Sequence, residues 1–258
     1  MKLLILSSPN VFNDFVVLNL LKKYDSVLTI QEDQDNMHVL KRTFGRKKHS
    51  FMSKINRLLF YIYFFLFLRK KAVKLFVEKL NFSGKLEPDY KIKNINDPQI
   101  LQIAEEFSPD LILVFGTSLL GKKWFTLNVS IVNSHLGIIP RYRGWMSWFW
   151  AILEGNFDSV GISVHYVTKI ADGGELILQD HVDIFKLEKI DLPHLLFSVT
   201  VLVNENIGRA IAKIQQSKKM DLDFDKYGYV EKYPHYFEPG ITDYIKFVSV
   251  TRKLNRKE

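Results

Sequence analysis

An asparagine, a histidine and an aspartate stand out as side chains that could act together on a carbonyl carbon. Asn133 and His135 lie two residues apart after a short apolar run, and Asp172 lies further along in a glycine-containing loop. Histidine moves protons near neutral pH, and an asparagine amide can donate a hydrogen bond to a developing oxyanion. A carboxylate can orient and polarise the imidazole. These residue types therefore fit transfer of an acyl group to a bound nucleophile.

Two other kinds of chemistry find no support in the sequence. The chain contains no cysteine, which removes disulfides, thiolate metal sites and cysteine nucleophiles. No serine lies in the Gly-x-Ser-x-Gly pattern of a nucleophile elbow. We therefore expect the acyl group to pass directly to the acceptor, without a covalent serine intermediate, and we expect no metal site.

Buried strands and the helices between them must position these side chains. Apolar residues 3–6, a polar turn and helix-periodic residues 12–21 predict a strand followed by a helix, and residues 27–30 predict a second strand. A central strand is expected at 111–115. A short one at 130–132 would deliver Asn133 and His135 to its carboxyl end, where open α/β sheets bind ligands. The predicted fold is α/β, with a Rossmann-like, mostly parallel open sheet and helices on both faces.

The remaining pattern adds further elements and a domain boundary. Helices are expected at 100–107, 145–153 and 193–214, and strands at 161–167 and 176–184. Residues 1–214 would form the catalytic domain, and the polar residues 215–258 a small C-terminal extension or hairpin. His165 lies on one of these strands, where a structural, hydrogen-bonded role is expected rather than a catalytic one.

Four motifs that follow one another along the chain make the functional prediction more specific. They are the pair Asn133 and His135, the run Pro140 to Gly144, the strand Gly161 to His165 and the loop Asp172 to Gly174. In this combination the chain resembles the 10-formyltetrahydrofolate-dependent formyltransferase family, strongly over 111–184 and weakly over the N-terminal strand–helix unit. That family includes glycinamide ribonucleotide formyltransferase, methionyl-tRNA formyltransferase and the sugar N-formyltransferases.

The resemblance implies roles for individual residues. Asn133 and a protonated His135 would stabilise the oxyanion, while Asp172 would hold His135 and help to move the amine proton toward the folate leaving nitrogen. The pterin ring of 10-formyltetrahydrofolate is expected along two loops, bound largely through backbone groups. The predicted donor-binding residues are Phe115, Gly116, Thr117, Leu119, Leu120, Ile170, Ala171 and Gly173. Ser8, Asn10 and Arg143 are expected to bind the acceptor substrate.

Features outside the motifs narrow the choice among possible acceptor substrates. Methionyl-tRNA formyltransferases carry a separate C-terminal domain, for which the residues after 184 are too few. Glycinamide ribonucleotide formyltransferases carry a glycine-rich phosphate loop near the N-terminus, where this chain has Pro9 and Asn10. We therefore expect formylation of a nucleotide-linked amino deoxysugar in surface polysaccharide biosynthesis, such as that of O-antigen or lipopolysaccharide. Another small amine, such as glycinamide ribonucleotide, is the alternative.

Positive charge is concentrated in one segment. The chain has a formal net charge of +8, yet residues 41–79 alone hold twelve Lys or Arg and one Glu. This favours a local anionic partner, a phosphorylated small molecule or a membrane surface, over nucleic acid. An inactive relative that binds membrane or nucleic acid through this segment is the hypothesis from another class. The apolar run 58–68 is shorter than the roughly 20 residues that span a bilayer. A buried or dimer-forming helix is favoured there over an interfacial one.

The start of the chain and the overall composition indicate a soluble protein. Only four apolar residues precede the first polar turn, too few for the apolar core of a secretory signal. Hydrophobic residues make up 47% and charged residues 25% of the chain, as in ordinary globular domains. We therefore expect a cytoplasmic protein, with a homodimer as an open possibility.

Overall fold

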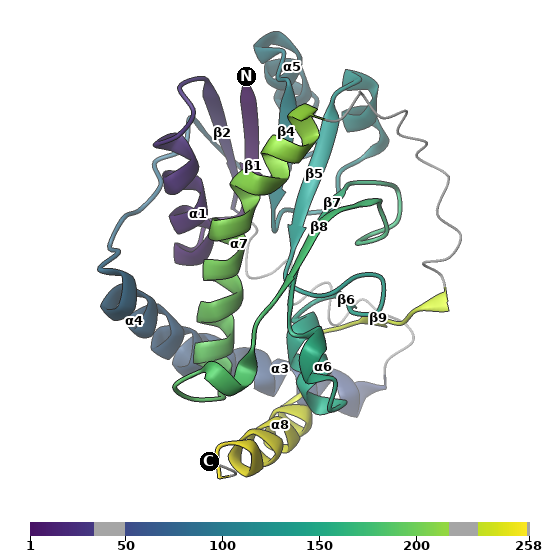
Figure 1. The fold of residues 1–258 in the computed structure, drawn as a ribbon. Helices are drawn as coiled ribbons and strands as arrows, with labels where there is room; N and C mark the ends of the chain where they lie inside the picture. The colour runs from purple at the N-terminus through teal and green to yellow at the C-terminus, as the bar shows by residue number, and fades with distance from the viewer. Residues whose placement is uncertain (34–49, 217–231, 257–258) are drawn as a thin grey trace.

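The computed structural model describes residues 1–33, 50–216 and 232–256, which form an α/β fold around a seven-stranded sheet (Figure 1). The strand order is β3-β2-β1-β4-β5-β7-β8. The first five strands in this order are parallel, and β7 and β8 are antiparallel to their neighbours. The strands are β1 (Leu3–Ser7), β2 (Val27–Glu32), β3 (Tyr90–Ile92), β4 (Leu111–Phe115), β5 (Ser130–His135), β7 (Gly161–Tyr166) and β8 (Leu176–His181). The predicted Rossmann-like, mostly parallel sheet is confirmed.

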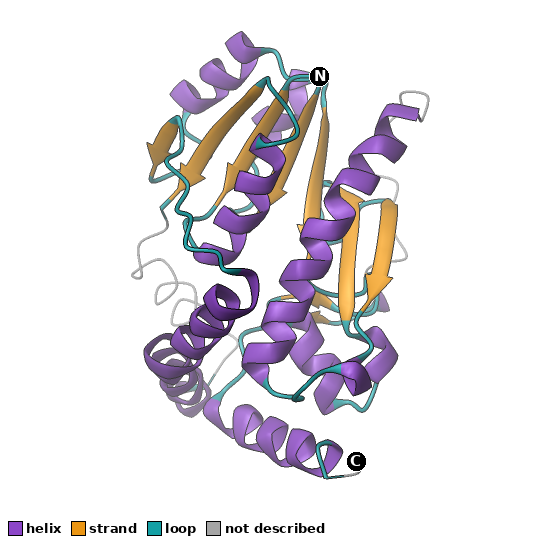
Figure 2. Ribbon diagram, turned by 60° about the vertical axis from the view of Figure 1, so that its left-hand side comes forward, coloured by secondary structure: helices purple, strands orange, loops and turns teal. Residues whose placement is uncertain are grey.

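Helices cover both faces of the sheet, as expected for strands that are apolar along their whole length. The α-helices are α1 (Val11–Leu21), α3 (Phe51–Tyr63), α4 (Arg69–Leu80), α5 (Pro98–Phe107), α6 (Ser147–Leu153), α7 (Leu192–Gln216) and α8 (Ile241–Leu254). Shorter helical segments are η1 (Phe64–Leu68), η2 (Lys122–Leu127), η3 (Phe157–Ser159) and η4 (Ile184–Lys186). Seen from the side, α7 runs the length of the sheet across one face (Figure 2).

Successive side chains of β1 point to opposite faces of the sheet and pack into two different cores. Leu3 and Ile5 pack into the larger core with α1, α7 and the α3–α4 region, whereas Leu4 and Leu6 pack into a smaller core with α5 and η2. Trp124 of η2 closes the smaller core, and its indole nitrogen donates to the Ile95 carbonyl at 3.1 Å. A strand buried on both faces must be apolar at every position, which is the pattern seen at residues 3–6.

The structure also differs from the sequence predictions in several elements. The strand predicted at 130–132 continues through His135, because residues 132–135 pair with β7. The last strand ends at His181, and Ile184 begins a 3-10 turn instead. The C-terminal tail holds a 14-residue helix, α8, where a hairpin or irregular extension was expected. The basic run 46–49 lies outside the described residues.

One long helical run, α3–η1–α4, was predicted only in part. It extends without interruption from Phe51 to Leu80, because polar residues flank the apolar stretch without breaking the helix. Its buried residues recur every four positions: Phe60, Phe64, Leu68, Ala72 and Phe76. In a straight α-helix this spacing drifts by about 40° per step, and the wider π-type turn of η1 counteracts that drift. One face of the run is therefore packed on the domain, while the opposite face is exposed, so the buried helix predicted at 58–68 is only partly buried in this chain.

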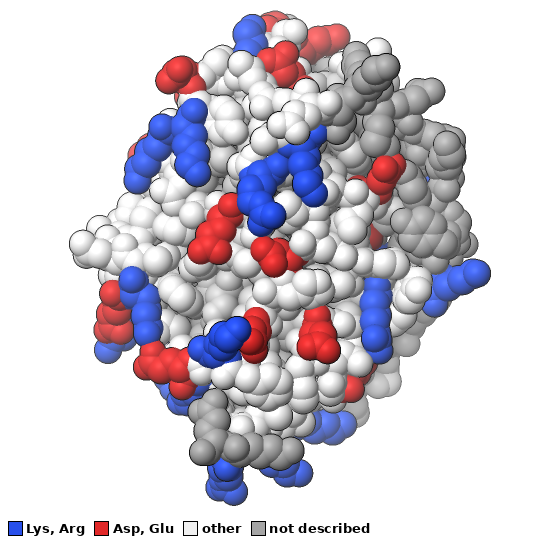
Figure 3. Space-filling model, in the orientation of Figure 1, with Lys and Arg blue, Asp and Glu red and all other residues white. Residues whose placement is uncertain are grey.

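Two helices are long and apolar enough to cross a membrane when judged by length and composition, the α3–η1–α4 run and α7. The 11-residue apolar run in the sequence underestimated the first of these helices. Both pack against the main core through several side chains. On the face shown in Figure 3, Lys and Arg are interspersed with Asp and Glu, so the basic excess is not concentrated there.

A layer of elements lies beyond the carboxyl ends of the parallel strands. It contains α3, α6 and α8, with a small two-stranded sheet of β6 (Arg143–Gly144) and β9 (His235–Tyr236) (Figure 1). Phe149 of α6 stacks on Phe247 of α8, with ring centroids 4.6 Å apart. The described part of the C-terminal tail is thus packed against the edge of the sheet where ligands are expected.

Candidate active site

Strand pairing brings the predicted catalytic residues together. On β5, Asn133 lies opposite His165 of β7, and His135 lies two residues further along β5. The loop between β7 and β8 then returns and places Asp172 beside them. These placements agree with the predicted cluster, although Asn133 lies within a strand rather than after one.

Asp172 is the centre of the cluster. Its Oδ1 atom lies 3.3 Å from Nδ1 of His135, 3.5 Å from the amide nitrogen of Asn133 and 3.7 Å from Nε2 of His165. Its Oδ2 atom accepts a 2.9 Å hydrogen bond from the backbone N–H of Gly144. The residue has a φ of 52°, in the left-handed region that Asp and Asn tolerate better than most residues. One oxygen thus faces three polar side chains while the other is fixed to the backbone.

The surroundings of Asp172 favour its ionised form. Burial raises the pKa of this carboxyl, but the nearby His135 ring and the Gly144 N–H lower it by more, so the pKa lies well below its ordinary value. The side chain is nevertheless 14% exposed. A negative charge is therefore held at the centre of the cluster with an opening to solvent.

His135 is held from both sides of its ring. Nε2 donates to the Tyr142 carbonyl at 2.9 Å and lies 3.1 Å from the Ser147 hydroxyl, while Nδ1 faces Asp172. Burial lowers the pKa of His135, and the Asp172 carboxylate opposes this by favouring the protonated ring. With an acceptor at each nitrogen, the ring can hold two protons, and it must exchange one partner to reach a reacting atom.

His165 has a different hydrogen-bond pattern. Its Nδ1 donates to the Tyr166 carbonyl at 2.8 Å, which leaves Nε2 as an acceptor. The Asn133 amide nitrogen lies 3.2 Å from that Nε2 and donates to it. This contact fixes which way the Asn133 amide faces, because only its NH₂ group can donate. His165 is therefore a positioning residue for Asn133.

The tail supports the loop that holds Asp172. Gly144 pairs with Tyr236 in the small β6–β9 sheet, and a Cβ atom at Gly144 would lie 2.1 Å from the Tyr236 carbonyl oxygen. The φ of Gly144, +94°, also favours glycine. The hydroxyl groups of Tyr236 and Tyr142 both donate to the Glu154 carboxylate, at 2.7 and 2.8 Å. Burial and this hydrogen bond raise the pKa of Tyr142 to about 12, so it stays a donor at neutral pH.

The predicted donor-binding residues lie on two loops. Phe115 ends β4, and Gly116 follows with a φ of +71°. Leu119 is 75% exposed and presents an apolar surface of the kind that a pterin ring would cover. On the second loop, Ile170 packs around Gly173, next to Asp172. Thr117, Leu120 and Ala171 lie on the same loops, and the donor-binding role of all eight residues stays a prediction.

The predicted acceptor-binding residues lie in two places. Asn10 caps α1 by accepting from the N–H groups of Phe12 and Asn13, and the Ser8 hydroxyl lies beside Gly116. Arg143 is buried, and it donates to the Tyr233 carbonyl at 2.7 Å and to the Ala171 carbonyl at 3.5 Å. Arg143 is thus close to Asp172, whereas Ser8 and Asn10 adjoin the end of β4. Substrate binding by these residues stays a prediction.

Sequence reasoning missed three of the groups that support the cluster. The backbone groups of Tyr142 and Gly144 and the Ser147 hydroxyl each contact a predicted catalytic residue. The hydrogen-bonded, structural role expected of His165 agrees with its contact with Asn133. A backbone carbonyl or amide leaves no signal in residue types, and the sequence alone did not show that Ser147 lies beside His135.

Comparison with known proteins decides the family. Residues 35–192, more than half of the chain, match the formyl transferase family. This chain belongs to the formyl transferase family. The matched region includes Asn133, His135 and Asp172 together with all four sequence motifs.

The curated relatives that this chain matches include methionyl-tRNA formyltransferases. The chain is 32% identical over 102 residues to a methionyl-tRNA formyltransferase from Syntrophus aciditrophicus, a match that covers 39% of this chain and 32% of that protein. Across three such enzymes the match spans 29–37% of the relative's length. The chain thus spans about a third of the length of these curated relatives.

Solved structures share the fold at low sequence identity. A phosphoribosylglycinamide formyltransferase from Anaplasma phagocytophilum aligns with a TM-score of 0.53 and 16% identity, covering 85% of this chain and 90% of that one. A sugar N-formyltransferase from a Shewanella species aligns with a TM-score of 0.51 and 14% identity, covering 97% of this chain and 88% of the other. Both alignments support the formyl transferase fold.

Proposed function

We propose that the protein transfers a formyl group from 10-formyltetrahydrofolate to the amino group of a nucleotide-linked amino deoxysugar. The main observation in support of formyl transfer is that Asn133 and His135 both face Oδ1 of Asp172, in a member of the formyl transferase family. The donor supplies an electrophilic formyl carbon. The proposed location is the cytoplasm, where folates and nucleotide sugars are available.

Asn133 and His135 are proposed to stabilise the negative charge that develops on the formyl oxygen. The Asn133 NH₂ group has one N–H directed at His165 and a long 3.5 Å contact with Asp172. Exchanging that long contact for the formyl oxygen costs little, and hydrogen bonds in unliganded sites are often long before substrate binds. His135 lies beside the same region, and the Asp172 carboxylate favours its protonated form as negative charge develops on the formyl oxygen.

Asp172 is proposed to receive a proton from the attacking amine, directly or through His135. Its carboxylate is ionised at neutral pH and has Oδ1 directed into the cluster, while Oδ2 stays bonded to Gly144. Because the backbone N–H fixes this second oxygen, the first keeps its direction as the proton arrives. The proton can then pass toward the leaving nitrogen of the donor.

The assignment of an amino sugar as the acceptor is based on the first turn of the fold. Residues 8–10 contain no glycine, and the Ser8 hydroxyl and Asn13 side chain fill the space beside Gly116. This turn differs from the glycine-rich phosphate loop of glycinamide ribonucleotide enzymes. The proposed nucleotide diphosphate would be recognised by cationic groups such as Arg143, which lies near Asp172. The end product would enter a surface polysaccharide such as O-antigen or lipopolysaccharide.

Mass spectrometry of the reaction products tests both parts of the proposal. The full chain would be mixed with 10-formyltetrahydrofolate and, separately, with nucleotide-linked amino sugars, glycinamide ribonucleotide or methionyl-tRNA. We expect a mass increase of one formyl group on an amino-sugar nucleotide. Formylation of glycinamide ribonucleotide or methionyl-tRNA alone would overturn the acceptor assignment, and no formylation of any amine would overturn the activity.

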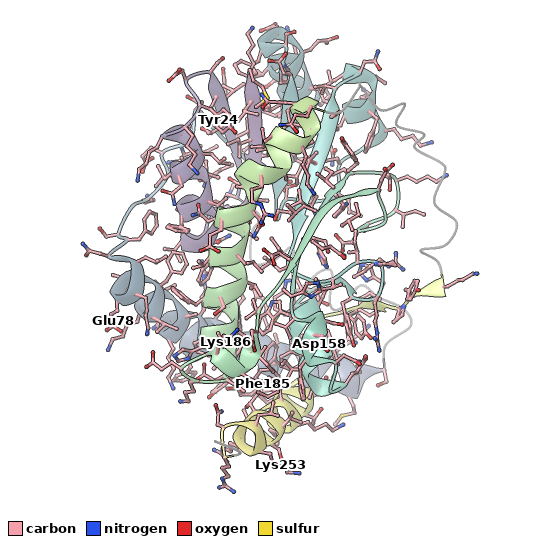
Figure 4. The ribbon with its side chains drawn as sticks, in the orientation of Figure 1. Tyr24, Glu78, Asp158, Phe185, Lys186 and Lys253 are labelled. Carbon is pink, nitrogen blue, oxygen red and sulfur yellow. The ribbon has the colours of Figure 1, made fainter. Side chains whose placement is uncertain are left out.

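Two variants connect that activity to the site. Asn133→Ala and His135→Ala should each lower turnover at least about a hundredfold, the scale seen when an oxyanion donor or general base is removed. Asp158→Asn is the control, because this acid (labelled in Figure 4) is exposed and lies on η3, an element that contributes no residue to the cluster. Full turnover in both alanine variants would show that the cluster is not the active site.

A further inference from the structure

The α3–η1–α4 run has an exposed apolar face that the formyl transfer site does not use. Leu59, Ile62 and Leu66 follow one another at helical spacing and are 50%, 45% and 51% exposed. Phe67 beside them is 53% exposed, and Met52 continues the same face toward the N-terminal end of the run. Apolar patches of this kind on soluble proteins commonly mark an interaction surface.

Basic residues continue this face toward the C-terminal end. Lys70 and Lys74 lie four and eight residues after Leu66, and Lys71 lies beside them, all three exposed. Residues 51–80 hold seven Lys or Arg and a single acid, Glu78. Glu78 lies at the outer end of α4 (Figure 4), where it forms a 3.6 Å ion pair with Lys74. We call Met52, Leu59, Ile62, Leu66, Phe67, Lys70, Lys71 and Lys74 the docking face.

The charge of this face argues against a second copy of the chain as its occupant. A two-fold dimer would place the same surface of each subunit against the other, so two basic helices would meet. Like charges in contact repel one another, most strongly where water is excluded. The docking face itself offers no acid to balance Lys70 and Lys71.

An anionic lipid surface fits both halves of the face. Exposed leucine, isoleucine and phenylalanine side chains enter the acyl boundary, and lysines reach the phosphate groups of the lipids. Each Lys or Arg near such a surface adds a similar electrostatic increment. We propose that the docking face attaches the protein to an anionic phospholipid membrane, with the helix lying along the surface.

The opposite face of the helix explains why it lies on the membrane and does not cross it. Phe60, Phe64 and Phe76 are buried in the main core, and Phe76 makes edge-to-face contacts with Phe12 and Phe15 of α1. Inserting the whole helix into a bilayer would pull these rings out of the domain. One face of the helix is therefore packed on the protein, and the opposite face is exposed and available to lipid.

Vesicle co-sedimentation of the full chain tests the proposal. We expect binding to vesicles of phosphatidylcholine mixed with phosphatidylglycerol, weak binding to phosphatidylcholine alone, and a steep loss of binding with added salt. Leu66→Ser/Phe67→Ser and Lys70→Glu/Lys71→Glu should each weaken binding at least about tenfold. The matched controls, Ile245→Ser and Lys186→Glu/Lys253→Glu, alter exposed residues elsewhere and should bind like the unmodified chain.

Several results would overturn the proposal. One is failure of the unmodified chain to bind anionic vesicles at low salt, and another is equal binding by the docking-face variants and the controls. Resistance to extraction with alkaline carbonate would show a spanning helix. A dimer in light scattering that Leu66→Ser/Phe67→Ser dissociates would show that a second copy covers the face. Because all substituted side chains are exposed, circular dichroism should report an unchanged fold.

Discussion

Asn133 and His165 face each other across the antiparallel strands β5 and β7, and the Asn133 amide nitrogen lies 3.2 Å from Nε2 of His165. This contact fixes the direction of an amide that is proposed to stabilise an oxyanion. A side chain that is already oriented before the reaction needs no reorganisation free energy when charge develops. We therefore expect His165 to affect the reaction through Asn133, without touching the reacting atoms.

Substitution of His165 should lower turnover by a moderate factor. His165→Phe removes one hydrogen bond to Asn133, worth about 1 kcal/mol, so kcat/KM should fall about fivefold to tenfold. Asn133→Ala should then cost less in the His165→Phe background than in the unmodified chain, because the two residues act together. Steady-state kinetics would measure both, with His181→Gln as a surface control. Fully independent effects of the two substitutions would contradict the positioning role.

The charge of Asp172 should be measurable at His135. Burial lowers the pKa of His135, and Asp172 opposes that shift. Asp172→Asn removes the negative charge and keeps a residue that tolerates a positive φ, so the pKa of His135 should fall further. NMR titration of nitrogen-labelled histidines would report the shift, and Asp158→Asn should leave it unchanged. A rise in the pKa would contradict the contact between His135 and Asp172.

Stability should depend on pH through the same imidazole. The folded pKa of His135 lies below its ordinary value of 6.5. Between these two values the unfolded chain binds more protons than the folded one, so the free energy of unfolding should rise with pH across that window. His135→Gln should flatten the rise, whereas His181→Gln should not. Urea unfolding at a series of pH values would measure this dependence.

Two adjacent residues of α4 should differ sharply in their effect on stability. Phe76 is fully buried and contacts the rings of Phe12, Phe15, Phe82 and Phe197, whereas Val77 is exposed. Phe76→Ala should lower the free energy of unfolding by about 3–5 kcal/mol, and Val77→Ala by less than about 0.5 kcal/mol. Chemical denaturation would measure both. Similar values for the two would mean that α4 is not packed on the domain.

The centre of the sheet was accessible from sequence because β4 and all but the last residue of β1 are apolar. The runs at 3–6 and 111–115 have to be buried on both faces, and few other folds satisfy that requirement. The cluster predicted to be catalytic was accessible because the chemistry expected of it resides in side chains, as at His135. The full length of the helix between Phe51 and Leu80 was less evident, since polar and basic residues interrupt its apolar pattern without ending the helix.

Contacts of the tail were not accessible in the same way. Tyr236 pairs through its backbone with Gly144, and neither residue type predicts such a pairing from the sequence. Only Phe247 and Thr251 of α8 are buried, so most of its apolar residues do not mark the face that packs on the domain. Tertiary contacts with α3 and α6 decide its position.

The pairing of Gly144 with Tyr236 sets an order of events during protein synthesis. A ribosome adds about 5–20 residues each second, so the segment from 133 to 172 leaves the exit tunnel several seconds before Tyr236 does. During that interval the backbone of residues 143–144 has no neighbouring strand, and the nascent polypeptide exposes it to chaperones and proteases. The candidate active site therefore gains its Gly144–Tyr236 support only after Tyr236 has been synthesised, whichever amine is the acceptor.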